Sequence, residues 1–296
     1  MAVTTATVAA AAEPLSVWPV AQRLARVQRR GRYLPASNAH PGKMLPALAA
    51  EAIRRYSQPG ELVLDPLCGI GTTLVEAIHQ GREAVGVELE PRWAALAAAN
   101  IHHAREQGAS GNAVAVRGDA RRLGRGLLDQ YAGACALILS SPPYGNSTHG
   151  HVRKHADRVE KRNTRYSRNP DNLAHLPQRP SRSLRQDFAS ALAEILAGCH
   201  RMLSPGGRLV LTARPYRQHG ALVDLPGQLI GLAGQAGLEL VSRQVALLCG
   251  LRGDQLVPRA SFFQIQHQRN GAIPRMLIIA HEDVLVFQPS RTTARS

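Results

Sequence analysis

The sequence predicts an α/β fold of the doubly wound type, with a seven-stranded, mostly parallel sheet. Three observations support this prediction. From about residue 60, short apolar runs alternate with longer amphipathic stretches, a pattern typical of parallel sheets covered by helices. A glycine-rich stretch, DPLCGIGTT at 65–73, directly follows the first apolar run, at the position where open α/β sheets bind ligands. The 296 residues are 44% hydrophobic, which suits one large domain, expected at 15–290.

Turn and cap signals bound the expected elements. Gly60 precedes the first strand, Gly81 closes the first helix, and Pro91 suits the first turn of the second helix. The segment SPGG at 204–207 stops the third helix. The expected strands lie at 61–65, 83–88, 113–119, 134–140, 208–215, 238–248 and within 276–288. The expected helices lie at 72–81, 91–107, 183–203 and 225–237.

Three segments lie outside this alternation. Residues 145–186 follow the fourth strand, show no clear helix or strand pattern, and are rich in Arg, Lys, His, Asn and Pro. A stretch of this length without regular structure inside a compact domain is usually functional or disordered, so we expect a basic insertion that becomes ordered on its substrate. The Ala- and Thr-rich residues 1–14 predict a disordered tail. The sequence LRGDQ at 251–255 predicts a surface turn.

The charge of the chain indicates a polyanionic partner. There are 36 Lys and Arg against 21 Asp and Glu, which gives a formal net charge of +15. So basic a chain favours nucleic acid. A GC-rich genome, which encodes Arg often, produces the same excess, so the charge alone does not decide between the two explanations.

Cysteine usage and the amino terminus predict a soluble, cytoplasmic protein. The four cysteines are widely separated, at Cys68, Cys135, Cys199 and Cys249. Without a Cys-x-x-Cys pair, they argue against a zinc site and against a disulfide framework. The histidines at 149, 151 and 155 lack an evident fourth ligand, so no metal is expected. The amino terminus lacks the basic region of a signal peptide, and no apolar run approaches the roughly 18 residues that a membrane helix needs.

The glycine-rich stretch has the chemistry of a cofactor loop. Gly69 and Gly71 allow a sharp turn and a close approach to a ligand, while Asp65 opens the loop and Thr72 adds a hydroxyl. A carboxylate at this point would repel a phosphate and attract a cation. S-adenosylmethionine carries an ammonium, a sulfonium and no phosphate, and it fits this loop better than a nucleotide.

Two further acids follow the next two strands. Glu88 lies 23 residues after Asp65, close to the roughly 20-residue spacing of ribose-binding carboxylates. Asp119 ends the third strand, where its carboxylate can accept from an adenine amino group. An Asp after a strand is more often a helix cap, but three acids at three consecutive strand ends favour a shared ligand.

The loop and a second motif together resemble a known family. DPLCGIGTT, followed downstream by SPPY at 141–144, resembles the amino-methyltransferases that act on cytosine N4 or adenine N6 of DNA. The segments HPGKMLPALAAEAI at 40–53, NPDNLAHL at 169–176 and HEDVLVFQ at 281–288 are also similar to small bacterial DNA methylases. The likeness spans about residues 15–288 and implies a class I methyltransferase domain, S-adenosylmethionine as cofactor and DNA as partner. The implied cofactor-binding residues are Lys43, Asp65, Pro66, Cys68, Gly69, Gly71, Thr72, Glu88 and Asp119.

The SPPY turn supplies the catalytic groups that the resemblance implies. The lone pair of an exocyclic amine is delocalised into the base, so two acceptors that hold its N–H groups localise that pair on nitrogen. The Ser141 hydroxyl and the Pro142 carbonyl are the expected acceptors, and Pro142 and Pro143 stiffen the backbone that carries them. Tyr144 is expected to stack on a base flipped out of the duplex. Cytosine C5 methylation is disfavoured, because no Pro-Cys pair provides the nucleophile.

Basic residues around the catalytic half have two interpretations. Lys43 either pairs with the carboxylate of the cofactor or is a solvated lysine at a helix start. The insertion either contacts DNA phosphates, with Tyr166 or an Arg filling the gap left by the flipped base, or is a solvated loop. Its candidate contacts are Arg153, Lys154, Arg158, Lys161, Arg162, Arg165 and Tyr166.

Two rival functions remain open. A tRNA guanine-N2 methyltransferase shares this type of loop and a PPY turn, but such enzymes usually carry an amino-terminal RNA-binding domain, and only about forty residues precede HPGK here. Their turn also commonly begins with Asp, whereas this chain has Ser141, which favours DNA over RNA and cytosine N4 over adenine N6. A non-catalytic nucleic-acid binder on the same fold is the second rival. No nuclease motif is visible, so a restriction endonuclease partner would be a separate chain.

Overall fold

A computed structural model gives the architecture of the chain. It describes residues 15–144, 151–155, 158–162, 167, 169, 172–176, 187–218, 221–259 and 279–290. For 151–155, 158–162, 217 and 218 it describes the backbone alone. The expected tail at 1–14 lies outside the described residues.

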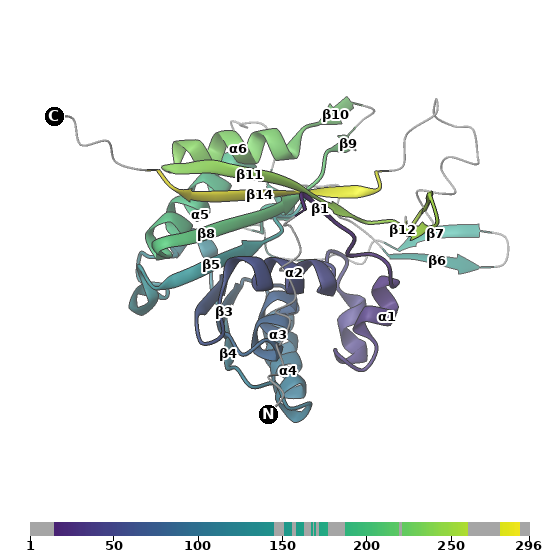
Figure 1. Ribbon diagram of the computed structural model, residues 1–296, viewed down its shortest axis with the longest axis horizontal. Helices are drawn as coiled ribbons and strands as arrows, with labels where there is room; N and C mark the ends of the chain where they lie inside the picture. The colour runs from purple at the N-terminus through teal and green to yellow at the C-terminus, as the bar shows by residue number, and fades with distance from the viewer. Residues whose placement is uncertain are drawn as a thin grey trace, which may run out of the picture.

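The centre of the molecule is an eight-stranded sheet in the order β1-β11-β14-β8-β5-β2-β3-β4 (Figure 1). Neighbouring strands are parallel, except that β14 is antiparallel to both β8 and β11. Strand order reverses between β2 and β5, which is where such sheets bind ligands at their carboxyl ends. The strands are β1 (Val17–Trp18), β2 (Leu62–Asp65), β3 (Glu83–Glu88), β4 (Ala113–Arg117), β5 (Cys135–Ser140), β8 (Leu203–Ala213), β11 (Leu238–Leu247) and β14 (His281–Pro289).

Helices cover both faces of this sheet. On one face lie α2 (Pro46–Tyr56), α3 (Thr72–His79) and α4 (Pro91–Glu106), and on the other lie α5 (Phe188–Met202) and α6 (Leu225–Gln235), as Figure 1 shows. A short helix, α1 (Ala25–Arg29), packs beside α2. None of the helices in the described part of the chain is both long enough and apolar enough to cross a membrane.

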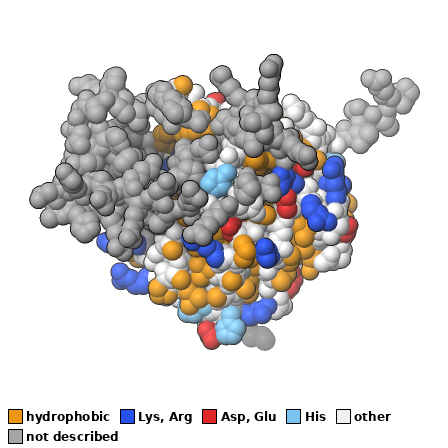
Figure 2. Space-filling view, turned by 180° about the vertical axis from the view of Figure 1, so that it is seen from behind, with side chains coloured by type: hydrophobic (Ala, Val, Ile, Leu, Met, Phe, Trp, Pro, Cys, Tyr) orange, Lys and Arg blue, Asp and Glu red, His pale blue; other side chains and the backbone are white. Residues whose placement is uncertain are grey.

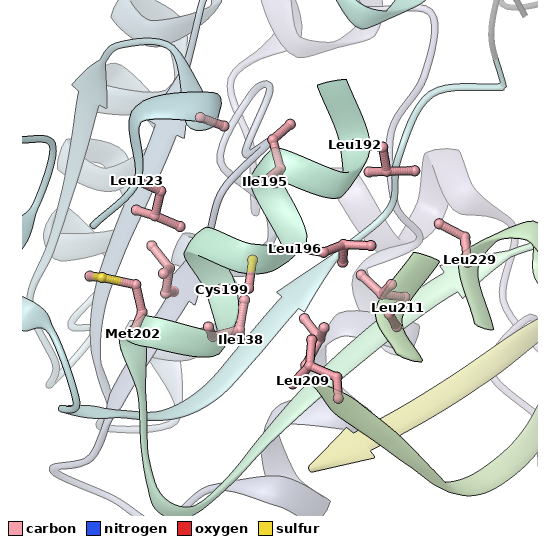
Figure 3. Packing of buried hydrophobic residues seen from close by; sticks show 14 of the residues in the cluster. Leu123, Ile138, Leu192, Ile195, Leu196, Cys199, Met202, Leu209, Leu211 and Leu229 are labelled. Atoms are coloured by element: carbon pink, nitrogen blue, oxygen red, sulfur yellow. The ribbon is translucent and has the colours of Figure 1, made fainter. Parts of the chain in front are cut away.

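The two faces of β5 explain why its sequence is apolar at nearly every position. Leu137 and Leu139 belong to the hydrophobic cluster formed with α2, α3 and α4, whereas Ile138 belongs to the cluster under α5 and α6. Side chains alternate between faces along a strand, so a strand buried on both faces must be apolar throughout. Figure 3 shows Ile138 of the sheet beside Cys199 of α5, and Leu211 of the sheet beside Leu196 of α5.

Every expected strand and helix of the main alternation is present, but the sheet has one strand more than predicted. β1 adds to the edge of β11 through Val17 and Trp18, and the Trp18 side chain is buried. A two-residue strand has no periodicity to read, so only its tertiary contacts reveal it. β8 also begins earlier than expected, at Leu203, and its pairing with β5 shifts in register near the glycines that follow.

The expectation that 145–186 contains no strand is wrong. Strands β6 (His151–His155) and β7 (Arg158–Arg162) form an antiparallel hairpin that projects from one end of the molecule (Figure 1). In its register Arg153 lies opposite Glu160. The many charged residues of this segment hide the pattern of the two strands in the sequence. Ordering of the insertion on substrate stays a prediction.

Two smaller hairpins also lie outside the main sheet. β9 (Tyr216–Gln218) pairs with β10 (Ala221–Val223), and β12 (Gly250–Arg252) pairs with β13 (Gln255–Val257). The β12–β13 hairpin confirms the surface turn predicted in LRGDQ, because Gly253 there has a φ of +59°.

Candidate cofactor and catalytic site

The carboxyl ends of β2, β3 and β5 bring the predicted cofactor and catalytic residues to one edge of the sheet. Asp65 and Glu88 are the last residues of β2 and β3, and Ser141 directly follows β5. Because these strands are parallel neighbours, their ends meet, as the sequence predicted.

Asp65 connects the cofactor loop to the catalytic turn. Its Oδ1 accepts from the Ser140 hydroxyl and from the Leu67 backbone N–H, each at 3.0 Å, and its Oδ2 accepts from the Thr73 hydroxyl at 2.6 Å. An ionised carboxylate has about four acceptor sites, so three are used and one remains. Burial raises the pKa of Asp65 to about 6 although all three donors favour its charged form. This edge of the sheet therefore holds a buried carboxylate that has an unused acceptor site and whose charged form is destabilised by burial.

The loop after Asp65 needs glycine at two positions. Gly69 and Gly71 have φ values of +55° and +80°, a backbone conformation that is strained for any residue with a Cβ. A Cβ on Gly71 would also lie 3.2 Å from the Cβ of Ala97 in α4. Pro66 and Cys68 are buried, and burial raises the pKa of the Cys68 thiol, so this cysteine is a packing residue of the loop rather than a thiolate.

Glu88 has the unused acceptor capacity that a ribose diol needs. Its Oε2 accepts from the Gly69 backbone N–H at 2.9 Å and its Oε1 from the Glu90 backbone N–H at 2.8 Å. Two further acceptor sites remain on this carboxylate, which matches two hydroxyl donors. The side chain is buried, and burial raises its pKa to about 7.

Glu88→Gln is expected to remove part of the pH dependence of stability. Between pH 4.5 and about 7 the folded protein keeps a proton on Glu88 that the unfolded chain has lost, so wild-type stability falls as pH rises through this window. From pH 5 to pH 8, the free energy of unfolding of the Gln variant should rise by about 2 to 3 kcal/mol relative to that of the wild type. Urea unfolding of both proteins at the two pH values measures this. A stability difference that does not change with pH would contradict it.

Asp119 is already paired. Its Oδ1 accepts from the Arg121 backbone N–H at 3.0 Å, as a cap, and its Oδ2 lies 2.5 Å from the Arg121 guanidinium. To accept from an adenine amino group, as the sequence predicted, Asp119 must first release Arg121. The structure therefore supports the capping role of this residue more directly than the ligand role.

A group of cations lies next to the cofactor loop. Arg29 is buried, lies 3.5 Å from the Thr72 hydroxyl, and donates to the Met44 carbonyl. Lys43 donates to the His40 carbonyl, and burial together with the charge of Arg29 lowers its pKa to about 8. Arg29 is buried and Lys43 half-buried, and positive charge in such a place suits the predicted contact with a cofactor carboxylate. Arg29 was not expected from the sequence.

The catalytic turn is held at both ends. Its first residue, Ser141, is half-buried, Pro142 is buried and Pro143 half-buried, and Ser140 just before it is fixed by Asp65. At the other end the Tyr144 hydroxyl donates to Glu282 of β14 at 3.2 Å. Sequence analysis missed Ser140, Thr73 and Glu282. Ser140 carries a readable signal, a polar residue at the last position of a strand that is otherwise buried.

The end of the basic insertion is attached beside the cofactor edge. Ser167 donates to the buried Glu90 carboxylate, and the Asn172 amide lies 3.4 Å from it. Glu90 is the residue whose backbone N–H holds Glu88. Five of the predicted nucleic-acid contacts lie on the β6–β7 hairpin: Arg153, Lys154, Arg158, Lys161 and Arg162. Arg165 and Tyr166 lie outside the described residues.

On the face in Figure 2, Lys and Arg side chains of the described residues are spread out, with Asp and Glu between them. All four cysteines are buried and unpaired, and no cluster of metal-binding side chains occurs within the described ranges.

Comparison with known proteins identifies the relatives of this site. The model of a family described as DNA methylase matches residues 5–99, which include the cofactor loop and Glu88. Over these residues the chain is similar to the DNA methylases. It is 28% identical over 74 residues to the Type II methyltransferase M.MjaII of Methanocaldococcus jannaschii, a match covering 25% of this chain and 14% of that protein. It is 33% identical over 111 residues to a tRNA (guanine(10)-N2)-dimethyltransferase of the same organism, covering 37% of this chain and 31% of the relative.

The whole fold also has a solved counterpart. The [4+2]-cyclase SpnF superposes with a TM-score of 0.52 over 93% of this chain and 97% of that one, at 16% identity. The sheet is doubly wound and mostly parallel, as predicted for a class I methyltransferase, and S-adenosylmethionine is the cofactor expected from the sequence. The site fits this cofactor: Glu88 offers two free acceptor sites, Asp65 offers one, and Arg29 with Lys43 offers positive charge. A likeness to a cyclase shows that the fold by itself does not set the reaction.

Proposed function

We propose that the protein methylates an exocyclic amino group of a DNA base, with cytosine N4 favoured over adenine N6. The observation that carries this proposal is the 3.0 Å hydrogen bond from Ser140 to Asp65. This bond joins the loop that binds the cofactor to the turn that binds the amine, so the two substrates would meet at one edge of the sheet. When bound, S-adenosylmethionine supplies a methyl group on a positively charged sulfur, which an amine can take without a covalent enzyme intermediate.

Different residues would bind the cofactor and the amine. Glu88 would accept from the ribose hydroxyls, Asp65 would face the cationic part of the cofactor, and Arg29 with Lys43 would hold its carboxylate. Ser141 Oγ and the Pro142 carbonyl would accept from the amine, localising its lone pair on nitrogen. Because Ser140 and the prolines fix the backbone here, these acceptors are oriented before the base arrives. Tyr144 would stack on the base.

Charge and position support DNA as the substrate. The net charge is +15, and the basic hairpin follows the catalytic turn directly in the chain. A restriction endonuclease would be a separate partner. Transfer to guanine N2 of tRNA is the second candidate, because the tRNA methyltransferase relative matches more of this chain than M.MjaII does.

Mass analysis of nucleosides tests the proposal. The protein is incubated with S-adenosylmethionine carrying a deuterated methyl group, in the presence of both genomic DNA and bulk tRNA, and each nucleic acid is digested separately. We expect labelled N4-methylcytosine in the DNA, with labelled N6-methyladenine as the second possible product. Label only in tRNA guanine would favour the rival function, and label in neither would favour a non-catalytic binder.

Removing two charges from β7 is expected to weaken DNA binding in a salt-dependent way. Each phosphate contact contributes about 0.9 to the slope of log K against log salt, so Lys161→Ala with Arg162→Ala should lower that slope by about 2. Affinity for the cofactor should not change. Fluorescence anisotropy with labelled duplex DNA at several salt concentrations measures the slope. Arg54→Ala is the control, since Arg54 lies on α2 and pairs with Glu51. An unchanged slope in the β7 variant would exclude the hairpin from the interface.

A further inference from the structure

Three strand ends surround the aromatic residue of the catalytic turn. In the antiparallel pairing of β14 with β8, Asp283 lies opposite Ala213. Glu282 and Arg214 are the residues next to this last pair, at the edge where β8 ends. The turn after β5 brings Tyr144 to the same edge. An acid and a base that are distant in sequence from the SPPY motif thus lie beside its tyrosine.

The contacts fix the Tyr144 ring from several directions. Its hydroxyl donates to Glu282 Oε1 at 3.2 Å. The Arg214 guanidinium carbon lies 5.5 Å from the ring centroid, within the range of a cation–π interaction. The ring of Tyr216, at the start of β9, lies 5.9 Å away with an interplanar angle of 53°. Together, the hydrogen bond, the nearby cation and the second ring leave the tyrosine few other orientations.

The charges around Glu282 favour this arrangement. Burial raises the pKa of Glu282, and the positive charge of Arg214 and the hydrogen bond from Tyr144 oppose that rise. Burial raises the pKa of Tyr144 well above its usual value, so its hydroxyl remains a donor. The Glu282 side chain accepts from the phenol, as the 3.2 Å hydrogen bond shows.

We infer that Glu282 is a positioning residue for methyl transfer, which orients the Tyr144 ring for the incoming base while Arg214 covers that ring. The inference rests on the proposed function, in which Tyr144 stacks on the base. A ring already oriented loses less freedom when a base stacks on it, so the loss of Glu282 should impair turnover and leave the cofactor site intact.

The test compares Glu282→Ala, Tyr144→Phe and their double variant with the wild type, using genomic DNA and tritiated S-adenosylmethionine. Either single variant should lower kcat about tenfold, corresponding to one lost hydrogen bond. The double variant should also lose about tenfold rather than a hundredfold, because both changes remove the same interaction. Glu282→Gln keeps an acceptor oxygen and should recover most of the rate. The affinity for S-adenosylhomocysteine, measured by calorimetry, should match the wild type in every variant.

Asp283→Asn is the matched control, since Asp283 is the next acid on β14 and accepts from Arg243 Nε at 2.8 Å rather than from Tyr144. The inference is overturned if Glu282→Ala keeps the wild-type kcat. It is also overturned if the losses of kcat add up in the double variant, or if Asp283→Asn loses as much kcat as Glu282→Ala. If Glu282→Ala does not fold, the other two single variants still test the inference. Tyr144→Phe must then lower kcat, and Glu282→Gln must keep most of it. If the wild type transfers no methyl group to any nucleic acid, the proposed function fails and this inference fails with it.

Discussion

Asp65→Ala is expected to abolish binding of S-adenosylmethionine while changing stability only modestly. The variant loses the carboxylate proposed to face the cofactor and leaves the Ser140 and Thr73 hydroxyls without their acceptor. Each buried donor left unsatisfied costs about 1–3 kcal/mol. Against this, the shift in the pKa of Asp65 from 3.8 to about 6 means that its charge costs about 3 kcal/mol at neutral pH. These opposing effects nearly cancel, so the main effect should appear in binding.

Calorimetry with S-adenosylhomocysteine and urea unfolding measure the two quantities separately. We expect affinity to fall at least a hundredfold, which corresponds to about 2.7 kcal/mol. Asp65→Asn is the matched control, because it keeps one acceptor oxygen for Ser140 but removes the negative charge. Normal affinity in the Ala variant would refute the assignment of Asp65 to the cofactor.

Ser141→Ala is expected to show the opposite behaviour, with normal cofactor affinity and a large loss of turnover. Ser141 supplies one of the two acceptors proposed for the amine, and loss of one oriented group in a comparable catalytic site costs about a hundredfold in kcat. Its neighbour Ser140 makes the contact with Asp65, so the cofactor loop should be undisturbed. Single-turnover methyl transfer measures the rate of the chemical step.

Ser140→Ala is the informative companion to that variant. It removes a hydroxyl from Asp65 and leaves Ser141 in place, so it should weaken cofactor binding more than Ser141→Ala does. If the two serine variants have the same effect on affinity and on rate, the division between structural and catalytic serine is wrong.

The elements that carry the site were predictable because their signals are local. The strand at Cys135–Ser140 is apolar on both faces, and the two prolines after it can only end it. Asp65 and Glu88 were placed at a shared edge from the parallel alternation alone, and β2 and β3 put them there. In each case a few neighbouring residues determine the local structure, and the topology of parallel sheets does the rest.

The partners of those residues were not predictable, because they come from distant parts of the chain. Tyr144 and Glu282 are separated by 138 residues, and nothing near HEDVLVFQ marks this particular acid. Arg29 reaches Thr72 from a five-residue helix that has no strong pattern. The hairpin at β6 and β7 was missed because its charged residues resemble those of a solvated loop. Asp119 was given a ligand role from its position, but the neighbouring Arg121 occupies its carboxylate.

The central claim is that cofactor and base amine meet where Asp65 and Ser140 are hydrogen-bonded, and a crystal structure of the protein with S-adenosylhomocysteine and duplex DNA tests it most directly. We predict an extruded base whose amino nitrogen lies about 2.7–3.2 Å from both Ser141 Oγ and the Pro142 carbonyl oxygen, with the cofactor ribose on Glu88. The account is contradicted if the cofactor binds away from Asp65, or if the amino group of the extruded base is held by residues outside the SPPY turn.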